Sequence, residues 1–200
     1  MIKEELGEYL IELARETVEK YLQDGVRPEP PEVGQDELYE KRGVFVTLKK
    51  EGKLRGCIGR PLPSQTLLEG LMESAISAAV GDPRFPSVDE NELSDITFEV
   101  SVLTVPEEIE VDDPKEYVDE IEVGSHGLIA KGRGREGLLL PQVPVEQGWG
   151  EEEFISQTCV KAGLSPDSWM DKDVRIEKFS ARVFKEESPG GDVGEDGFSK

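Results

Sequence analysis

The sequence predicts an α+β fold with mostly antiparallel sheets, in which helices pack on strands that arrive as hairpins. Three observations favour this class. Runs of alternating apolar and polar residues occur in pairs separated by short polar turns, which is typical of β-hairpins. Segments with apolar residues at helical spacing are inserted between these runs. The chain lacks the regular succession of strand, helix and strand that a parallel sheet requires.

The first part of the chain is expected to hold one helix and one hairpin. Apolar residues recur at helical spacing from Glu4 to Gln23, and Gly25 is a suitable stop. The proline-rich segment 27–35 is expected to be an extended connection. Residues 43–50 alternate as in a half-buried strand, and after a short turn 53–59 forms the second strand of the hairpin.

The middle of the chain is expected to continue with a helix, a strand and a second hairpin. Ser64 can cap a helix that runs through Leu67 to Ala79, whose small and aliphatic face should pack on the first hairpin. A strand follows at 95–104, and an acidic connection at 106–123 leads to the second hairpin over 124–143.

The last part of the chain is expected to form a helix from Glu151 to Ala162 and a final strand over 174–184. After Phe184, residues 185–200 contain too few apolar side chains to order themselves. They are therefore predicted to form a disordered acidic tail.

The net charge of −21 arises from 44 acidic and 23 basic side chains, which are spread along the 200 residues. An acidic surface repels phosphate backbones, so nucleic acid is disfavoured as the main partner. A high-salt cytoplasm would also account for dispersed carboxylates, because salt screens their repulsion.

The first residues lack the apolar run of a signal peptide, and no run is long enough to span a membrane. We therefore expect a soluble, cytoplasmic protein with reduced cysteines.

Cys57 lies between two glycines near the end of the second predicted strand. Because alternate side chains of a strand share a face, Arg55 and Cys57 are expected to point the same way. A nearby positive charge lowers the pKa of a cysteine, and Gly56 and Gly59 leave room for a ligand or another backbone to approach the sulfur. The alternative is a buried structural cysteine beside a glycine bulge, since free cysteines are among the most buried residues.

His126 is the only histidine of the chain, so no other imidazole could partner Cys57 in catalysis. A lone histidine is more often a structural or surface residue, and the sequence does not bring the two side chains together. Cys159 differs from Cys57 because it shares an approximately helical apolar face with Phe154 and Ile155, which indicates core packing.

Three further charged residues are candidates for the site. Asp82 and Arg84, in the sequence DPRF, could orient a catalytic group and bind a polar ligand, or could instead form a local ion pair that holds a turn. Glu99 lies among apolar residues of a predicted strand, where a buried carboxylate needs a partner. It could also face solvent together with Thr97 and Ser101.

The sequence GRGREG at 132–137 satisfies the GxGxxG pattern but is interpreted as a hairpin loop. A dinucleotide site needs a helix after the glycines, and here a strand-like run with a proline follows. Arg133 and Arg135 form the only local basic cluster, which leaves weak anion or RNA contact as an alternative.

One histidine and two distant cysteines give no zinc-site spacing, and no P-loop is present, so we expect neither a metal nor another cofactor.

Five motifs follow the order and spacing of the AMMECR-type domain family: LRGCIG at 54–59, DPRFP at 82–86, EVSVLT at 99–104, VGSHG at 123–127 and LLPQV at 139–143. The chain resembles this family from the first helix to about Phe184, and the hexapeptide is its specific signature. The resemblance implies one domain over residues 1–184, an α+β fold of two intertwined lobes with the hexapeptide at or near the cleft that they form. It points to Memo-like or radical SAM proteins as partners, because relatives are fused to them or encoded beside them.

The resemblance implies no particular reaction, and the preferred hypothesis from the residues is an enzyme that transfers a group on a small molecule or a protein. Cys57 would be the nucleophile or covalent carrier, and His126 the general base or acid. Arg55 would stabilise the thiolate or an oxyanion, and Asp82 or Glu99 would orient a neighbouring group.

Two other functions are weighed against this enzyme. In the first, the glycine-rich hexapeptide shapes a cleft for a peptide or protein, and the cysteine merely packs. In the second, which ranks lowest, Arg133 and Arg135 contact RNA. An accessible, reactive Cys57 favours the enzyme, whereas a buried, inert thiol favours the binding module.

Overall fold

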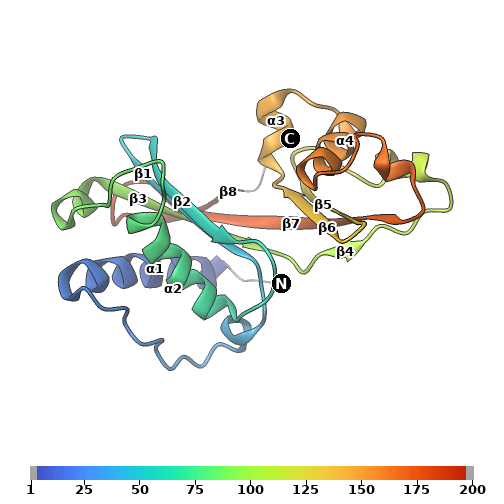
Figure 1. Ribbon diagram of the computed structural model, residues 1–200. Helices are drawn as coiled ribbons and strands as arrows, with labels where there is room; N and C mark the ends of the chain where they lie inside the picture. The colour runs from blue at the N-terminus through green and yellow to red at the C-terminus, as the bar shows by residue number, and fades with distance from the viewer. Residues whose placement is uncertain (1–3, 197–200) are drawn as a thin grey trace. The chain divides into compact units, whose positions relative to one another are not determined.

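The computed structural model describes residues 4–196 and consists of helices and antiparallel strands, which confirms the predicted α+β class (Figure 1). Contacts divide the chain into two compact units. Of the described residues, the first unit comprises 4–103 and 182–196, and the second comprises Thr104–Ala181. The chain therefore leaves the first unit once and returns to it.

The first unit is a sheet with two helices on one face. β1 lies between β2 and β3 and pairs antiparallel with both, and β8 pairs with the last residues of β7. The elements are α1 (Glu4–Asp24), β1 (Val44–Lys50), β2 (Lys53–Arg60), α2 (Leu67–Val80), β3 (Ile96–Leu103) and β8 (Val193–Asp196), and β7 spans Val174–Glu186.

Buried and more exposed side chains alternate along β1 and β3, so the two faces of this sheet differ. Val46 and Leu48 of β1 and Phe98 and Val100 of β3 are fully buried, and they form the core together with the apolar faces of α1 and α2. The opposite side, here called the second face, carries the alternate residues of the three strands: Phe45, Thr47, Lys49, Cys57, Thr97, Glu99 and Ser101.

The second unit is a smaller sheet covered by one helix. β5 lies between β6 and the first part of β7, and β4 pairs with β7. Phe154 and Ile155 of α4 pack on Leu128 and Ile176 of the sheet. The elements are β4 (Glu107–Glu108), β5 (His126–Gly132), β6 (Arg135–Leu139), α3 (Gln142–Gln147) and α4 (Glu151–Lys161).

Both predicted hairpins are present, and each turns through two residues with positive φ. These are Glu51 (52°) and Gly52 (74°) in the first hairpin, and Arg133 (54°) and Gly134 (72°) in the second. Two positive φ angles match the twist of the flanking strands. The interpretation of GRGREG as a hairpin loop is therefore confirmed.

Two expectations about the elements are wrong. The helix that follows the first hairpin is capped by Thr66 and not by Ser64, because Thr66 and Glu69 form a reciprocal capping box. Residues 185–196 are not disordered, since β7 continues to Glu186 and β8 pairs with it. Backbone hydrogen bonds between β8 and β7 order this segment, although it has few apolar side chains. Residues 197–200 of the predicted tail lie outside the described residues.

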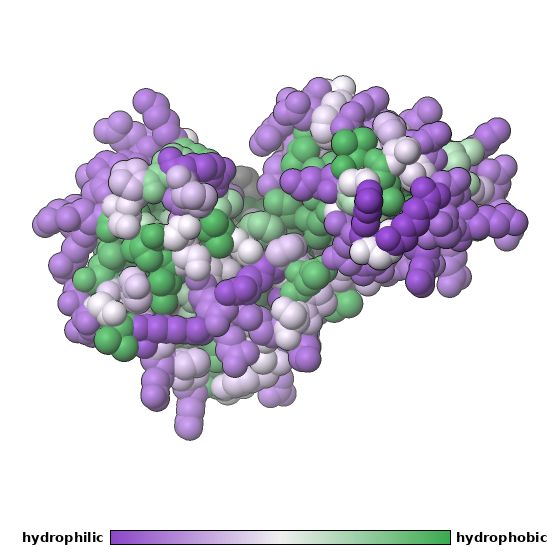
Figure 2. All heavy atoms as spheres, viewed as in Figure 1, coloured by the Kyte–Doolittle hydropathy of each residue, from purple (hydrophilic) through white to green (hydrophobic). Residues whose placement is uncertain are grey.

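Hydrophilic residues dominate the face of the molecule drawn in Figure 2, as expected from the net charge of −21. None of the helices within residues 4–196 is long and apolar enough to cross a membrane.

Candidate functional site

A β-bulge at Arg55 decides which way Cys57 points. The register between β1 and β2 shifts by one residue there, and Arg55 pairs with no residue of β1. An unbroken hairpin from the same turn would place Cys57 opposite Val46, on the face that forms the core. The bulge pairs Cys57 with Thr47 instead. The thiol therefore lies on the second face of the sheet, where it is half-buried.

Thr47 contacts the sulfur directly. Its hydroxyl Oγ1 donates a hydrogen bond to Cys57 Sγ over 3.2 Å, and the threonine itself is buried. A donor aimed at sulfur stabilises a thiolate more than a thiol. Thr47 could not be predicted from the sequence, because only the bulge brings it opposite Cys57.

Asp82 and Arg84 bind the backbone of Cys57. The Cys57 N–H donates to Asp82 Oδ2 at 2.9 Å, and the Cys57 carbonyl accepts from Arg84 Nη2 at 3.1 Å. β2 is an edge strand at this point, so the two side chains satisfy groups that a further strand would otherwise bind. Gly81 ends α2, and the helix end thereby positions the pair beside Cys57.

The Asp82–Arg84 ion pair places a cation next to Cys57. The Arg84 guanidinium donates to Asp82 from Nε at 2.9 Å and from Nη2 at 2.6 Å. These bonds, with a smaller contribution from the Cys57 N–H, hold the pKa of the buried Asp82 well below its usual range. Asp82 in turn raises the pKa of Arg84, and the Cys57 side chain adds to that shift. Arg84 is 54% exposed, so a ligand in solution can reach it.

Arg55 binds the segment that follows α2, and its predicted role beside the thiolate stays a prediction. Its guanidinium donates to the Pro86 carbonyl at 2.8 Å and to Glu92 Oε2 at 2.9 Å, which lowers the pKa of Glu92 to about 2. Arg55 therefore ties β2 to the segment that follows α2. The arginine that hydrogen-bonds to Cys57 is Arg84.

The two glycines that flank Cys57 allow close packing inside the first unit. A Cβ atom on Gly56 would overlap the backbone carbonyl of Ala78 in α2, and a Cβ on Gly59 would overlap the ring of Phe45. Another backbone therefore approaches the hexapeptide at Gly56, which was one of the two predicted uses of these residues.

Glu99 lies on the second face, opposite Thr47 in the pairing of β1 with β3. Cys57, Thr47 and Glu99 thus form a row across three strands. Glu99 Oε2 accepts a hydrogen bond from Lys49 Nζ at 2.7 Å, and the glutamate side chain is 19% exposed. Lys49 is the partner that a partly buried carboxylate at this position requires.

His126 is the first residue of β5, in the second unit. Its Nδ1 accepts a hydrogen bond from the Glu122 backbone N–H at 3.1 Å, which leaves the ring proton on Nε2. Burial and then the charge of Lys178 lower the pKa of His126, so the ring is neutral at pH 7. Cys57 and His126 belong to different units, and their pairing stays a prediction.

Cys159 packs in the core of the second unit, as predicted. It is fully buried, and burial raises the pKa of its thiol to about 11. Within residues 4–196, no three or more His, Cys, Asp or Glu side chains are grouped so that they could hold a metal ion.

The arginines of the second hairpin loop already have partners. Arg133 forms salt bridges with Asp171 at 2.7 Å and with Asp173 at 3.0 Å. Arg135 donates to the backbone carbonyl of Gly163. These contacts oppose the weak anion or RNA binding that was considered for the loop.

Comparison with known proteins shows one consistent family. The family model described as AMMECR1 matches residues 11–184. A protein of Methanopyrus kandleri is 55% identical over 196 residues, which cover 96% of this chain and 93% of the relative. A protein of Thermococcus onnurineus is 54% identical, with 96% of each chain covered. The crystal structure of an uncharacterized protein from Pyrococcus horikoshii matches with a TM-score of 0.85 at 50% identity and covers 98% of both chains.

Proposed function

This chain belongs to the AMMECR1 family, and we propose that it is an enzyme in which Cys57 carries a group from one substrate to another. The hydrogen bond from Thr47 Oγ1 to Cys57 Sγ is the observation that carries the proposal. Cys57 is also half-buried, whereas Cys159 is fully buried in the core of the second unit. The exposed Arg84 beside it supplies a positive charge for a substrate carboxylate or for a developing oxyanion.

The proposed reaction is acyl transfer in two steps. In the first step the Cys57 thiolate attacks the carbonyl carbon of an acyl donor, a C–S bond forms, and the leaving group departs and takes a proton from solvent. In the second step an amine, a hydroxyl or water attacks the thioester, the C–S bond breaks, and the acceptor releases its proton to solvent. The donor or the acceptor can be a small molecule or a protein.

The neighbouring residues have distinct roles in this proposal. Thr47 stabilises the thiolate, and Arg84 contacts the substrate. Asp82 acts through Arg84 and the Cys57 backbone, so it is a positioning residue, and Glu99 with Lys49 borders the site on the second face. The role of His126 as general acid or base stays a prediction.

Trapping of the acyl group tests the proposal. The Cys159→Ala protein would be incubated with acetyl, succinyl and aminoacyl thioesters, and the Cys57 peptide would be analysed by mass spectrometry. We expect an acyl group on Cys57 that disappears when an amine acceptor is added, and slower acylation in Thr47→Val and Arg84→Met. His126→Ala in the same assay tests the predicted acid or base.

Thr97→Val is the matched control, since Thr97 shares the second face but its hydroxyl donates to the Lys49 carbonyl and not to sulfur. Acylation that is equally fast in Thr47→Val and in the parent protein would contradict the proposal. Failure of every donor to modify Cys57 would favour the binding module, a function with which the packing of Gly56 and Gly59 also agrees.

A further inference from the structure

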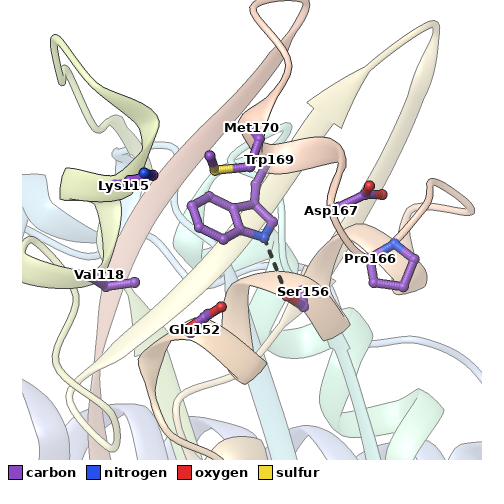
Figure 3. A pocket seen from close by; sticks show the side chains of 8 residues that line it. All are labelled: Lys115, Val118, Glu152, Ser156, Pro166, Asp167, Trp169 and Met170. Atoms are coloured by element: carbon purple, nitrogen blue, oxygen red, sulfur yellow. Dashed lines mark hydrogen bonds between the residues drawn. The ribbon is translucent and has the colours of Figure 1, made fainter.

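The second unit contains a groove that the proposed chemistry at Cys57 does not use. It lies between the segment around η3 (Pro114–Asp119), α4, and η4 (Ser168–Met170) (Figure 3). Its volume of about 580 Å³ lies in the range of ligand-binding sites.

The floor of the groove is apolar and held in place. The indole of Trp169 occupies its centre, with Met170 beside it and Val118 across from it (Figure 3). Trp169 Nε1–H donates to Ser156 Oγ at 3.2 Å, which fixes the orientation of the ring. Met170 is 38% exposed, although it is a large apolar residue. Trp169 itself is 7% exposed, so an aliphatic chain in the groove would bury mainly the exposed surface of Met170, without rearranging the indole.

The rim of the groove is acidic, and its carboxylates lack cationic partners. Glu152 and Asp167 are exposed, and among the residues that the structure describes neither forms a salt bridge. Asp171 and Asp173 of the same unit, in contrast, are both paired with Arg133. Lys115 also borders the groove, on the opposite side of the indole from Asp167 (Figure 3).

The groove continues along α4. A second depression of about 530 Å³ shares Val118, Glu152 and Ser156 with it and adds Glu151 and Glu153. The glutamates also stabilise the first turn of α4, so they alone do not define a site. Together with the floor around Trp169 they form an elongated surface with several negative charges, which suits an extended chain better than one small cation.

We propose that this groove docks an extended, basic segment of a partner protein. The stem of a lysine or arginine would lie across Met170 and the small exposed part of Trp169, and its charged end would meet Glu152 or Asp167. The acidic rim is complementary to such a segment and repels an acidic one.

A labelled peptide tests this docking site. A fluorescein-labelled peptide of alternating lysine and leucine would be titrated with the full chain, and binding would be followed by anisotropy and by the NMR signal of the Trp169 indole N–H. We expect the double variant Glu152→Gln and Asp167→Asn to bind about fivefold more weakly, because it loses two exposed ion pairs. Met170→Ala should also weaken binding.

Glu110→Gln with Glu146→Gln is the matched control, since it removes two exposed carboxylates of the same unit that do not line the groove. We expect its affinity to be unchanged. Equal weakening in both double variants would overturn the proposal, because the peptide would then respond only to net charge. Equal affinity for a glutamate and leucine peptide, or for N-acetyl-lysine amide alone, would overturn it as well.

Discussion

At the scale of the residue, the sulfur, the backbone N–H and the carbonyl of Cys57 each form a hydrogen bond with a different side chain. Thr47 donates to the sulfur, Asp82 accepts from the backbone N–H, and Arg84 donates to the carbonyl. Residue types in the sequence pointed to Cys57, Asp82 and Arg84. Residue types could not show that Thr47 contacts the sulfur. They also could not show that Arg84, and not Arg55, hydrogen-bonds to Cys57, because both contacts depend on the bulge at Arg55.

Removal of the Asp82 carboxylate should destabilise the first unit. In Asp82→Ala the Cys57 N–H and the Arg84 guanidinium lose a buried, charged acceptor, so we expect the free energy of unfolding at pH 7 to fall by about 3 kcal/mol. Urea unfolding measures this loss. Asp112→Ala, at an exposed aspartate, is the control and should change stability by less than about 0.5 kcal/mol.

The contribution of the Asp82–Arg84 ion pair to the free energy of unfolding should depend on pH. The pKa of Asp82 is lower in the folded protein than in the unfolded chain. Its stabilisation is therefore complete above the unfolded value of about 4 and is lost as the pH falls through the folded value. The stability difference between the wild type and Asp82→Ala should shrink between pH 7 and about pH 3. A difference that stays constant would show that the carboxylate charge does not stabilise the fold.

At the scale of the element, strands and helices were predicted well and the register was not. Alternation and turn residues placed both hairpins close to their observed bounds, and helical spacing placed α1, α2 and α4. The glycines beside Cys57 allowed for a bulge, but the sequence did not fix its position at Arg55, where it reverses the face of every later residue of β2. α3 was missed because it has only 6 residues and contains Pro144.

Gly56→Ala tests the contact between β2 and α2. A methyl group at this position would overlap the Ala78 carbonyl, which is backbone and cannot rotate away. We expect a loss of about 1–3 kcal/mol in the free energy of unfolding, as for other overpacked sites. Gly34→Ala is the control, because its added Cβ meets no atom within 4 Å. Equal stability of the two variants would mean that the hexapeptide glycine is not required for packing.

At the scale of the molecule, the returning end of the chain completes the first unit. Sequence composition led to the prediction that residues after Phe184 are disordered, because it counts apolar side chains and does not register backbone pairing or ion pairs. Glu186 is buried, and its carboxylate accepts from Arg15 at 2.6 Å and from the Phe98 N–H at 2.9 Å. Two segments far apart in the sequence thus share one core.

Truncation tests this dependence. A chain that ends at Ala181 lacks the buried Phe184 and the Glu186 carboxylate, so we expect α1 and α2 to lose their protection in amide hydrogen exchange. A chain that ends at Glu186 keeps both residues and should retain protection in the two helices. Full protection of α1 in the shorter chain would show that the C-terminal segment is dispensable for the first unit.

The alkylation rate of Cys57 in the folded protein is the most direct test of the proposed site. Iodoacetamide labelling of the Cys159→Ala protein would be followed by intact mass across neutral and alkaline pH. We predict that Cys57 reacts under native conditions, that Thr47→Val and Arg84→Met slow the reaction at neutral pH, and that Thr97→Val does not. Labelling that begins only when the protein unfolds, or a rate unaffected by Thr47 and Arg84, would contradict a functional thiol at Cys57.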